Sequence, residues 1–204
     1  MSRKEHWDDI YKEKSPDDLS WYQEEPTVSL SLIKNLFLEK DENIIDVGGG
    51  ASTLVDYILK EGFKNITVLD LSSNALSIAK QRMGDNAYLI DWKVEDVTSH
   101  VAEKKYSLWH DRAVFHFLTE KSDRDKYIRT LEESVRDGGH VIIAAFMIGG
   151  PTKCSGLNIV QYDAKKIKNA LGSNFNLIKE KPETHLTPAG TEQLFNYYVF
   201  SKNA

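Results

Sequence analysis

Cysteine and long apolar runs are both scarce in this sequence. The 204 residues include one cysteine, Cys154, so no disulfide can form within the chain. A single cysteine among scattered histidines also lacks the spacing of a zinc site, and no metal is expected. No apolar run approaches the roughly 18–20 residues that span a membrane, and the N-terminus lacks a secretory signal's apolar stretch. These absences argue against a membrane protein and favour a cytoplasmic one.

An excess of positive charge is missing too. The formal net charge is −5, and a mildly acidic chain is a poor general binder of nucleic-acid backbones. Nucleic acid is therefore not expected as a partner. The chain is 41% hydrophobic and has no repeat or linker, which fits one globular domain with a sizeable core. The sequence does not predict the oligomeric state.

Apolar runs alternate with amphipathic segments along most of the chain. This alternation is typical of strands buried on both faces of a parallel sheet, with helices between them. The expected strands are 44–47, 66–70, a run within 87–96, one from 106, and one within 140–148. The expected helices include 2–14, 53–61, 123–136 and 163–171, and one more that Ser72 or Ser73 caps. Two strand-like runs at 175–186 and 192–202 have no helix between them, which predicts an antiparallel hairpin at one edge.

The stretch IIDVGGGAST, residues 44–53, joins the first strand to its helix. Gly48 and Gly50 tolerate positive φ and let a ligand approach the backbone closely. In an open α/β sheet, ligands bind beyond the carboxyl ends of the strands. Acidic residues mark these ends at Asp46, Asp70, Asp96 and Asp111.

Each acidic residue has a plausible binding role. A carboxylate at Asp70 can accept both hydrogen bonds of a ribose diol, and one at Asp96 can accept an adenine amino proton. Asp46 would suit a cationic amine. Helix-capping aspartates and turn glycines are the alternative for any one of these residues, and the set in this order on consecutive strands favours a nucleoside site.

Two cofactors compete for the glycine turn. A dinucleotide motif, G-x-G-x-x-G, would need glycine where Thr53 stands. Asp46 beside the turn disfavours a pyrophosphate and favours a positively charged sulfonium nucleoside. The C-terminal hairpin also fits poorly with a dinucleotide domain.

The motifs resemble those of class I S-adenosylmethionine-dependent methyltransferases. DVGGGAS resembles their D/E-x-G-x-G-x-G motif, with Ser52 at the last glycine, and LDLS and VEDV resemble the two acidic motifs that follow. The resemblance covers about residues 42–202 and implies a Rossmann-like α/β fold: a seven-stranded, mostly parallel sheet with helices on both faces and an antiparallel C-terminal strand hairpin. WDDIY and SWYQ look like the lysine methyltransferases of elongation factor 1A or citrate synthase and their bacterial relatives.

The resemblance implies S-adenosylmethionine as cofactor and S-adenosylhomocysteine as product. The glycine turn would hold the methionine half, Asp70 the ribose, Leu71 the adenine face, and Asp96 and Val97 the adenine edge. The resemblance alone implies that the N-terminal aromatics Trp7, Tyr11 and Trp21 contact the cofactor. From the residues themselves, an aromatic lid over a cofactor and an aromatic helix packed in the core fit equally well. Residues 1–204 are expected to form one methyltransferase domain, with 1–41 as a helical cap segment and 42–204 as the cofactor-binding core.

The reaction itself demands few fixed residues. Methyl transfer from a sulfonium is an in-line displacement that depends on alignment, and a base is needed only for a protonated acceptor. In WHDRAVFHF, Asp111 stands where the family often places a residue facing the methyl group, and histidine, here His110, is the side chain type that can act as a base near neutral pH. A structural role is the alternative for both and for His116. Arg112 is expected to form a structural ion pair, and His185 to be an exposed histidine of the hairpin turn. Cys154 is interpreted as a bystander in a long loop, 149–160, suited to an acceptor lid.

The sequence therefore predicts a methyltransferase that acts on a small molecule or a protein side chain. An NAD-binding oxidoreductase is an alternative, disfavoured by Thr53 and the hairpin. A non-catalytic domain that binds the cofactor is the other.

Overall fold

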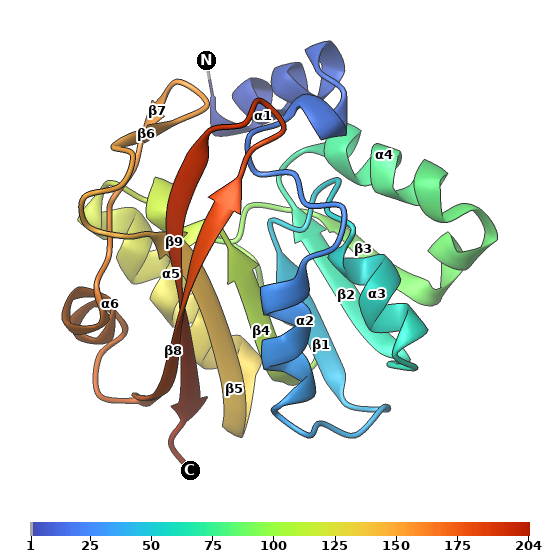
Figure 1. Ribbon diagram of the computed structural model, residues 1–204. Helices are drawn as coiled ribbons and strands as arrows, with labels where there is room; N and C mark the ends of the chain where they lie inside the picture. The colour runs from blue at the N-terminus through green and yellow to red at the C-terminus, as the bar shows by residue number, and fades with distance from the viewer. Residues whose placement is uncertain (1) are drawn as a thin grey trace. The chain divides into compact units, whose positions relative to one another are not determined.

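The computed structural model describes residues 2–204, which divide into two compact units. The first unit comprises Met1–Val97 with Leu186–Thr191, and the second comprises Thr98–His185 with Glu192–Ala204. Figure 1 shows the helices and strands of both units.

The first unit contains three parallel strands in the order β3-β2-β1. The register places Ile44 beside Ile66 and Asp70 beside Val94. The strands are β1 (Asn43–Val47), β2 (Asn65–Asp70) and β3 (Ile90–Val94). The helices are α1 (Arg3–Glu13), α2 (Thr27–Lys34), α3 (Leu54–Lys60) and α4 (Ser73–Met83), with 3-10 turns η1 (Pro16–Asp18) and η2 (Gly84–Leu89).

Local sequence explains where these helices begin. Ser2 and Glu5 form a reciprocal capping box at the start of α1. The Ser72 hydroxyl accepts the Ala75 N–H at the start of α4, as one of the two serines there was expected to do. Pro26 stands immediately before α2, where its missing N–H costs little.

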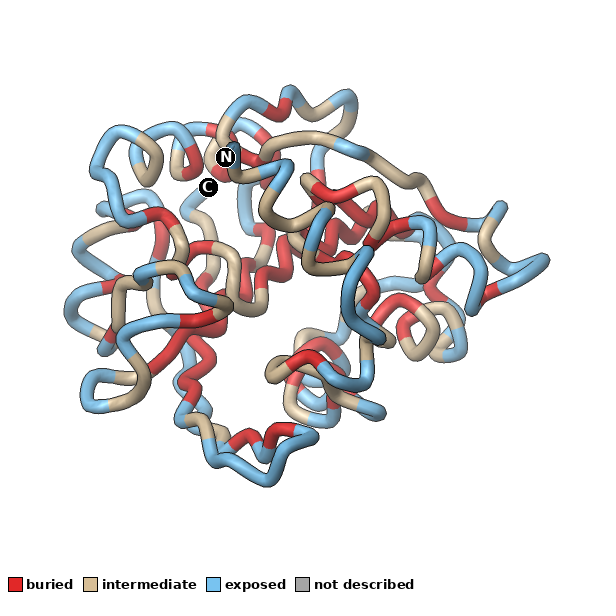
Figure 2. The backbone as a smooth tube through the Cα atoms, turned by 90° about the horizontal axis from the view of Figure 1, so that it is seen from above, coloured by how far each residue is buried: buried red, intermediate tan, exposed pale blue. Residues whose placement is uncertain are grey.

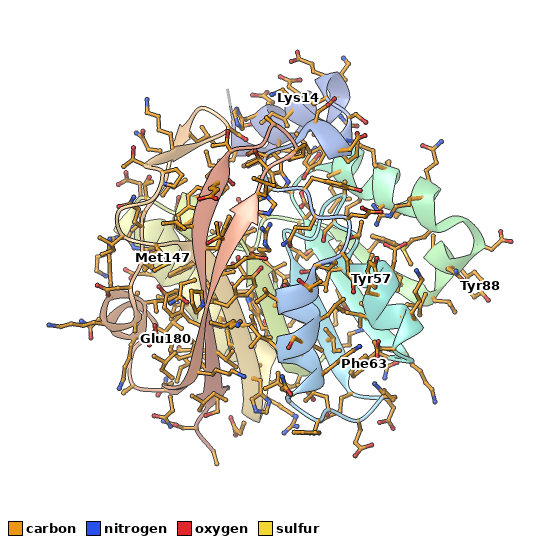
Figure 3. All side chains as sticks on the ribbon, in the orientation of Figure 1. Lys14, Tyr57, Phe63, Tyr88, Met147 and Glu180 are labelled. Carbon is orange, nitrogen blue, oxygen red and sulfur yellow. The ribbon has the colours of Figure 1, made fainter. Side chains whose placement is uncertain are left out.

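The third strand is shorter than the sequence predicts. Residues 87–89 of the expected 87–96 run belong to η2, and β3 begins at Ile90. Tyr88 is 81% exposed and projects away from the fold in Figure 3. The Trp92 indole N–H donates to the Ala87 carbonyl at 2.8 Å, which fixes the turn against the strand. The short apolar run at 87–89 is therefore a surface turn and not part of a strand, because periodicity alone does not distinguish a buried strand from an exposed turn in so short a run.

The second unit contains four strands in the order β4-β5-β9-β8. β4 and β5 are parallel, and β9 runs antiparallel to β5. The bounds are β4 (Tyr106–Arg112), β5 (Val135–Phe146), β8 (Phe175–Leu186) and β9 (Glu192–Lys202); the helices are α5 (Lys121–Ser134), α6 (Ala164–Leu171) and the 3-10 turn η3 (Phe115–Phe117). Asp163 caps α6 by accepting the Lys166 N–H at 2.7 Å, which confirms that expected helix start.

Two details of the second unit differ from expectation. Helix α5 ends at Ser134, and β5 begins at Val135, so the glycines 138–139 lie inside the strand and not after the helix. The register between β4 and β5 shifts between Tyr106 and Leu108, which accommodates them. The expected loop 149–160 contains a small hairpin of β6 (Lys153–Cys154) and β7 (Leu157–Asn158).

The expected fold class is confirmed. Seven strands form the mostly parallel Rossmann-like sheet, with an antiparallel C-terminal hairpin strand, and helices pack around the strands of each unit (Figure 1). Buried residues, red in Figure 2, include almost all of β1, β2 and the end of β5. Within residues 2–204, no helix combines the length and apolarity that crossing a membrane requires.

Candidate cofactor site

The turn after β1 has backbone angles that favour glycine. Gly48 and Gly50 have φ of 65° and 44°, in the left-handed region that side chains rarely adopt. At Gly49 an added Cβ would lie 2.6 Å from an Asp46 carboxylate oxygen and 2.7 Å from Val68. The turn therefore brings bare backbone against the ends of β1 and β2.

Asp70 lies beside this turn, at the end of β2. Its buried carboxylate accepts the backbone N–H of Ser72 at 2.7 Å and that of Gly50. Burial raises the pKa of Asp70 to about 7, against the two N–H donors, and the nearby charges of Asp46 and Asp8 raise it further. A carboxylate has about four acceptor positions, and two protein donors leave room for two more hydrogen bonds.

The remaining acidic positions also lie in the first unit. Asp46 is buried at 3% exposure, beneath the glycine turn. Asp96 follows β3, is partly exposed, and pairs with Arg3 at 3.1 Å. Val97 is buried, and Leu71 is half-buried between Asp70 and the cap of α4.

The three N-terminal aromatics form one cluster. The Trp21 ring meets the Trp7 and Tyr11 rings edge-on, at centroid distances of 5.7 and 6.3 Å. The Trp21 indole N–H donates to the Tyr11 hydroxyl at 3.3 Å. A Cβ on Gly50 would lie 3.1 Å from that hydroxyl and 3.0 Å from Asp70, so the cluster reaches the glycine turn. All three rings are half-buried, which fits a cover over the turn better than a closed core.

Sequence reasoning missed two side chains that organise this site. The Arg82 guanidinium of α4 donates to the carbonyls of Ala51 and Ser52 at 2.6 and 2.7 Å and pairs with Asp56. It thereby fastens the glycine turn to α4. Asp8 of α1 binds Ser72 and Asn74 at the start of α4. Neither residue stands in a glycine or acidic strand-end motif, so only tertiary contacts reveal them.

Ser52 explains the one departure from the glycine motif. Its hydroxyl accepts the Leu54 N–H at 3.1 Å at the start of α3. A side chain that supports the helix start can therefore replace the last glycine.

These residues fit a sulfonium nucleoside. The free acceptor positions of Asp70 suit a ribose diol, and two buried carboxylates, Asp46 and Asp70, favour a cationic ligand over a pyrophosphate. The positive-φ glycines leave the backbone open to it. Among residues 2–204, no group of three or more histidine, cysteine or acidic side chains is arranged to hold a metal ion.

The predicted catalytic residues lie in the second unit and are buried there. The Asp111 carboxylate, at 0% exposure, accepts the N–H groups of Val114 and Phe115 at 2.9 and 3.1 Å and the Tyr127 hydroxyl at 2.6 Å. Burial raises the pKa of Asp111 to about 6, despite these donors. Ala113 between them has φ of 72°, a strained conformation that the Asp111 bonds hold. These contacts give Asp111 a positioning role in its own unit, and its catalytic role stays a prediction.

The histidines of this unit are buried as well. His110 is 2% exposed, on β4 beside Ile142 of β5. His116 is fully buried among Phe117, Phe146 and Phe195, and neither ring nitrogen has a hydrogen-bond partner within residues 2–204. Burial, and then the charge of Arg112, lower the pKa of His116 to about 3, so its ring is neutral.

Arg112 belongs to a polar network of β4, β8 and β9. Its guanidinium donates to the Tyr197 hydroxyl at 2.9 Å, and this hydroxyl donates to Glu183 at 2.9 Å. Arg112 also lies over the Phe195 ring and 3.6 Å from Glu183. The structural ion pair expected for Arg112 is present. His185 is buried beside Phe195 and is not the exposed turn histidine that the sequence suggested.

Comparison with known proteins supports this description. Residues 45–141 match the model of the methyltransferase domain family. Malonyl-[acyl-carrier protein] O-methyltransferase 1 of Ilyobacter polytropus is 33% identical over 110 residues, which are 53% of this chain and 39% of that relative. Human EEF1A lysine methyltransferase 2 is 22% identical over 89% of this chain and 78% of the relative.

A solved S-adenosylmethionine-dependent methyltransferase from Anabaena variabilis has the same fold, with a TM-score of 0.77 at 14% identity over 100% of this chain and 96% of that one. The chain spans 39% and 43% of the two Ilyobacter polytropus relatives it matches, less than half of the length of each. The glycine turn, the acidic strand ends, the sheet and these similarities together lead to one conclusion: residues 45–141 are similar to the methyltransferase domain family, and the chain shares the fold of solved S-adenosylmethionine-dependent methyltransferases.

Proposed function

We propose that this chain transfers the methyl group of S-adenosylmethionine to a small-molecule or protein side-chain acceptor and releases S-adenosylhomocysteine. The observation that carries the proposal is Asp70: a buried carboxylate beside a positive-φ glycine turn, with two of its acceptor positions used by backbone N–H groups. An unsaturated buried carboxylate at the end of a parallel strand is suited to a diol.

The cofactor, when bound, supplies an electrophilic methyl group on sulfur. Asp70 would accept the ribose hydroxyls, Leu71 would pack on the adenine, and Asp96 with Val97 would bind the adenine edge. Gly48 and Gly50 would expose backbone to the methionine half, with Asp46 near its amine. Trp7, Tyr11 and Trp21 would cover the nucleoside and exclude water, which strengthens the electrostatic contacts beneath them.

The proposal is less specific about the methyl acceptor than about the cofactor. One relative is named for a malonyl-[acyl-carrier protein] and another for a lysine of a protein, so both acceptor classes remain in the proposal. Asp111 and His110 are its proposed catalytic residues. His110 is a base only if the acceptor arrives protonated, as a lysine does.

Three further elements belong to the same proposal. Residues 1–204 act as one methyltransferase domain, with 1–41 as its cap and 42–204 as its core. The protein works in the cytoplasm, in keeping with a sequence that has a single cysteine. Its partners are acceptors and not nucleic acids, in keeping with the net charge of −5.

Calorimetric titration with S-adenosylmethionine, S-adenosylhomocysteine and NAD in parallel tests the cofactor. We expect saturable binding of the two sulfur nucleosides and none of NAD. Binding of NAD alone would replace the proposal with an oxidoreductase.

The acceptor class is tested with methyl-labelled S-adenosylmethionine and a cell extract separated by ultrafiltration. Label in the low-mass filtrate identifies a small-molecule acceptor, and label on retained protein identifies a side chain. Saturable cofactor binding with no label in either fraction would favour a non-catalytic binding domain.

A further inference from the structure

The apolar side chains of helix α1, Trp7, Ile10 and Tyr11, are only half-buried. No residue between Arg3 and Glu13 is buried. A helix of this length is marginal on its own and normally depends on packing of an apolar face. Polar contacts to the rest of the first unit therefore contribute, beside the aromatic contacts with Trp21, to holding α1 in place.

Asp8 makes most of these contacts, at the start of α4. Its carboxylate accepts the Ser72 hydroxyl at 2.7 Å and, more weakly, the Asn74 backbone N–H at 3.4 Å. The Asn74 side-chain amide donates back to the Asp8 carbonyl at 2.9 Å. The carboxylate thus lies at the N-terminal end of a helix, where the peptide dipoles favour negative charge. Figure 1 shows α1 lying against this end of α4.

Ser72 connects Asp8 directly to the proposed ribose site. While its hydroxyl donates to Asp8, its backbone N–H donates to Asp70 at 2.7 Å. The Ser72 hydroxyl also accepts the Ala75 N–H and so caps α4. Ser72 therefore connects α1, the Asp70 carboxylate and the start of α4.

The next turn of α1 carries the side chain that reaches the glycine turn. Tyr11 stands three residues after Asp8, on the same face of the helix. Its hydroxyl accepts the Trp21 indole N–H and lies 3.1 Å from where a Gly50 Cβ would be. When Asp8 is bound to α4, Tyr11 is held over the turn.

We propose that Asp8 is a positioning residue: its carboxylate latches α1 to the start of α4 and thereby holds the Tyr11–Trp21 cover closed over the bound nucleoside. This inference rests on the proposed function. The latch is ionic as well as hydrogen-bonded, because Lys4 pairs with the same carboxylate at 2.5 Å. Although burial opposes it, hydrogen bonds from Lys4 and Ser72 hold the pKa of Asp8 below its ordinary value, so the latch is charged at neutral pH.

The test is the dissociation rate of S-adenosylhomocysteine from the full chain, measured by stopped-flow displacement and followed by tryptophan emission. Asp8→Ala removes the acceptor of the two hydrogen bonds from Ser72 and Asn74, and of the one from Lys4, and is expected to speed dissociation about tenfold. Asp8→Asn keeps an acceptor oxygen for Ser72, so its dissociation rate should lie between those of wild type and Asp8→Ala. Asp9→Ala is the matched control: it removes the same charge from an exposed neighbour on the same helix and should stay within about twofold of wild type.

A second readout does not depend on the ligand. Hydrogen exchange of the α1 amides in the ligand-free chain should accelerate in Asp8→Ala and not in Asp9→Ala, while the core amides of β1 and β2 stay protected. Faster α1 exchange together with faster dissociation supports the latch. A purely structural Asp8 would accelerate α1 exchange and leave dissociation unchanged, and that result overturns the proposal.

The outcomes separate this inference from the proposed function. A wild-type chain that binds S-adenosylhomocysteine, with Asp8→Ala dissociating at the wild-type rate, overturns the latch alone. A wild-type chain that does not bind the nucleoside overturns the proposed function and the latch with it. Protection of β1 and β2 in each variant shows that the comparison concerns folded protein.

Discussion

Each unit of this protein buries a carboxylate near the end of a strand, and the two carboxylates are used differently. Asp70 of the first unit accepts two backbone N–H groups and keeps acceptor positions unused by them. Asp111 of the second unit accepts two N–H groups and the Tyr127 hydroxyl, which itself accepts the Trp109 indole N–H. Burial raises the pKa of both, to about 7 and about 6.

The difference teaches how to interpret a buried acidic residue. A raised pKa reports burial and does not by itself indicate a function. The number of acceptor positions already used is more informative, because each protein donor bound to a carboxylate leaves one position fewer for a ligand. On this criterion we expect Asp70, with two donors, to bind a ligand more readily than Asp111, whose three donors include the N–H groups that follow the strained turn at Ala113.

The strongest way to break this comparison is Asp111→Ala. It leaves the Val114 and Phe115 N–H groups and the Tyr127 hydroxyl without their acceptor, so we expect the free energy of unfolding to fall by about 3 kcal/mol or more. Denaturant unfolding measures this loss. The control is Asp125→Ala at an exposed position, whose free energy of unfolding should stay within about 0.5 kcal/mol of wild type. A loss below 1 kcal/mol would show that Asp111 is not structurally committed and would favour its catalytic assignment.

Asp70→Asn should separate binding from stability. Loss of a charged hydrogen-bond acceptor is expected to weaken S-adenosylhomocysteine binding by about 10- to 150-fold. Calorimetry measures this, with Asp85→Asn, an exposed acid of the same unit, as control. The same variant should be more stable than wild type at pH 8, because it removes a buried charge. Unchanged affinity would remove Asp70 from the ribose site.

The pH dependence sharpens the assignment. When the pKa of a carboxyl rises on folding, the folded protein loses stability as the pH increases from the pKa in the unfolded chain, near 3.8, to the pKa in the folded chain. Above the folded-state pKa the loss of stability is complete. For Asp70 this window ends at about pH 7. Ribose hydroxyls donate to the ionised form, so cofactor affinity should increase severalfold between pH 6 and pH 8.

The control for this profile is the same titration on Asp70→Asn, which should show little pH dependence over that range. A wild-type affinity that is flat between pH 6 and pH 8 would mean that the ligand does not bind the ionised carboxylate. Buffer-dependent calorimetric enthalpies should also reveal proton release when wild type binds near pH 6.5.

The smallest expected effect concerns His116 in the second unit. A neutral imidazole has one donor and one acceptor, and His116 makes no hydrogen bond with either inside residues 2–204. His116→Phe keeps an aromatic ring among three phenylalanines and removes both buried polar atoms, so stability should rise by about 1 kcal/mol at pH 7. Thermal unfolding measures it; a loss of stability would show that the nitrogens are satisfied in solution.

This gain should depend on pH in a known direction. The pKa of His116 is lowered on folding to about 3, so wild type loses stability as pH falls from about 6.5 toward 3, where the unfolded chain binds the proton first. His116→Phe should lack this contribution and exceed wild type by more at pH 5 than at pH 7. His116→Ala, which opens a cavity, should be less stable than wild type at both values.

The sequence by itself determined the order of strands and helices along the chain and the place of the glycine turn after β1. The glycines at 48 and 50, the cap at Ser72 and the C-terminal hairpin were predicted because each depends on local chemistry: positive φ, a hydroxyl at a helix start, or two apolar runs with only a turn between them. The surface turn at 87–89 was missed because a short apolar run does not reveal whether it is covered.

Only the tertiary structure decided which polar groups are already used. Asp8 and Ser72 stand 64 residues apart, and Asp111 and Tyr127 stand 16 apart, and no spacing rule along the chain connects either pair. Whether a carboxylate is buried, and how many donors surround it, depends on elements that meet only after folding. The sequence therefore predicted the types of residue at the site, and folding decided which of them remain able to bind a ligand.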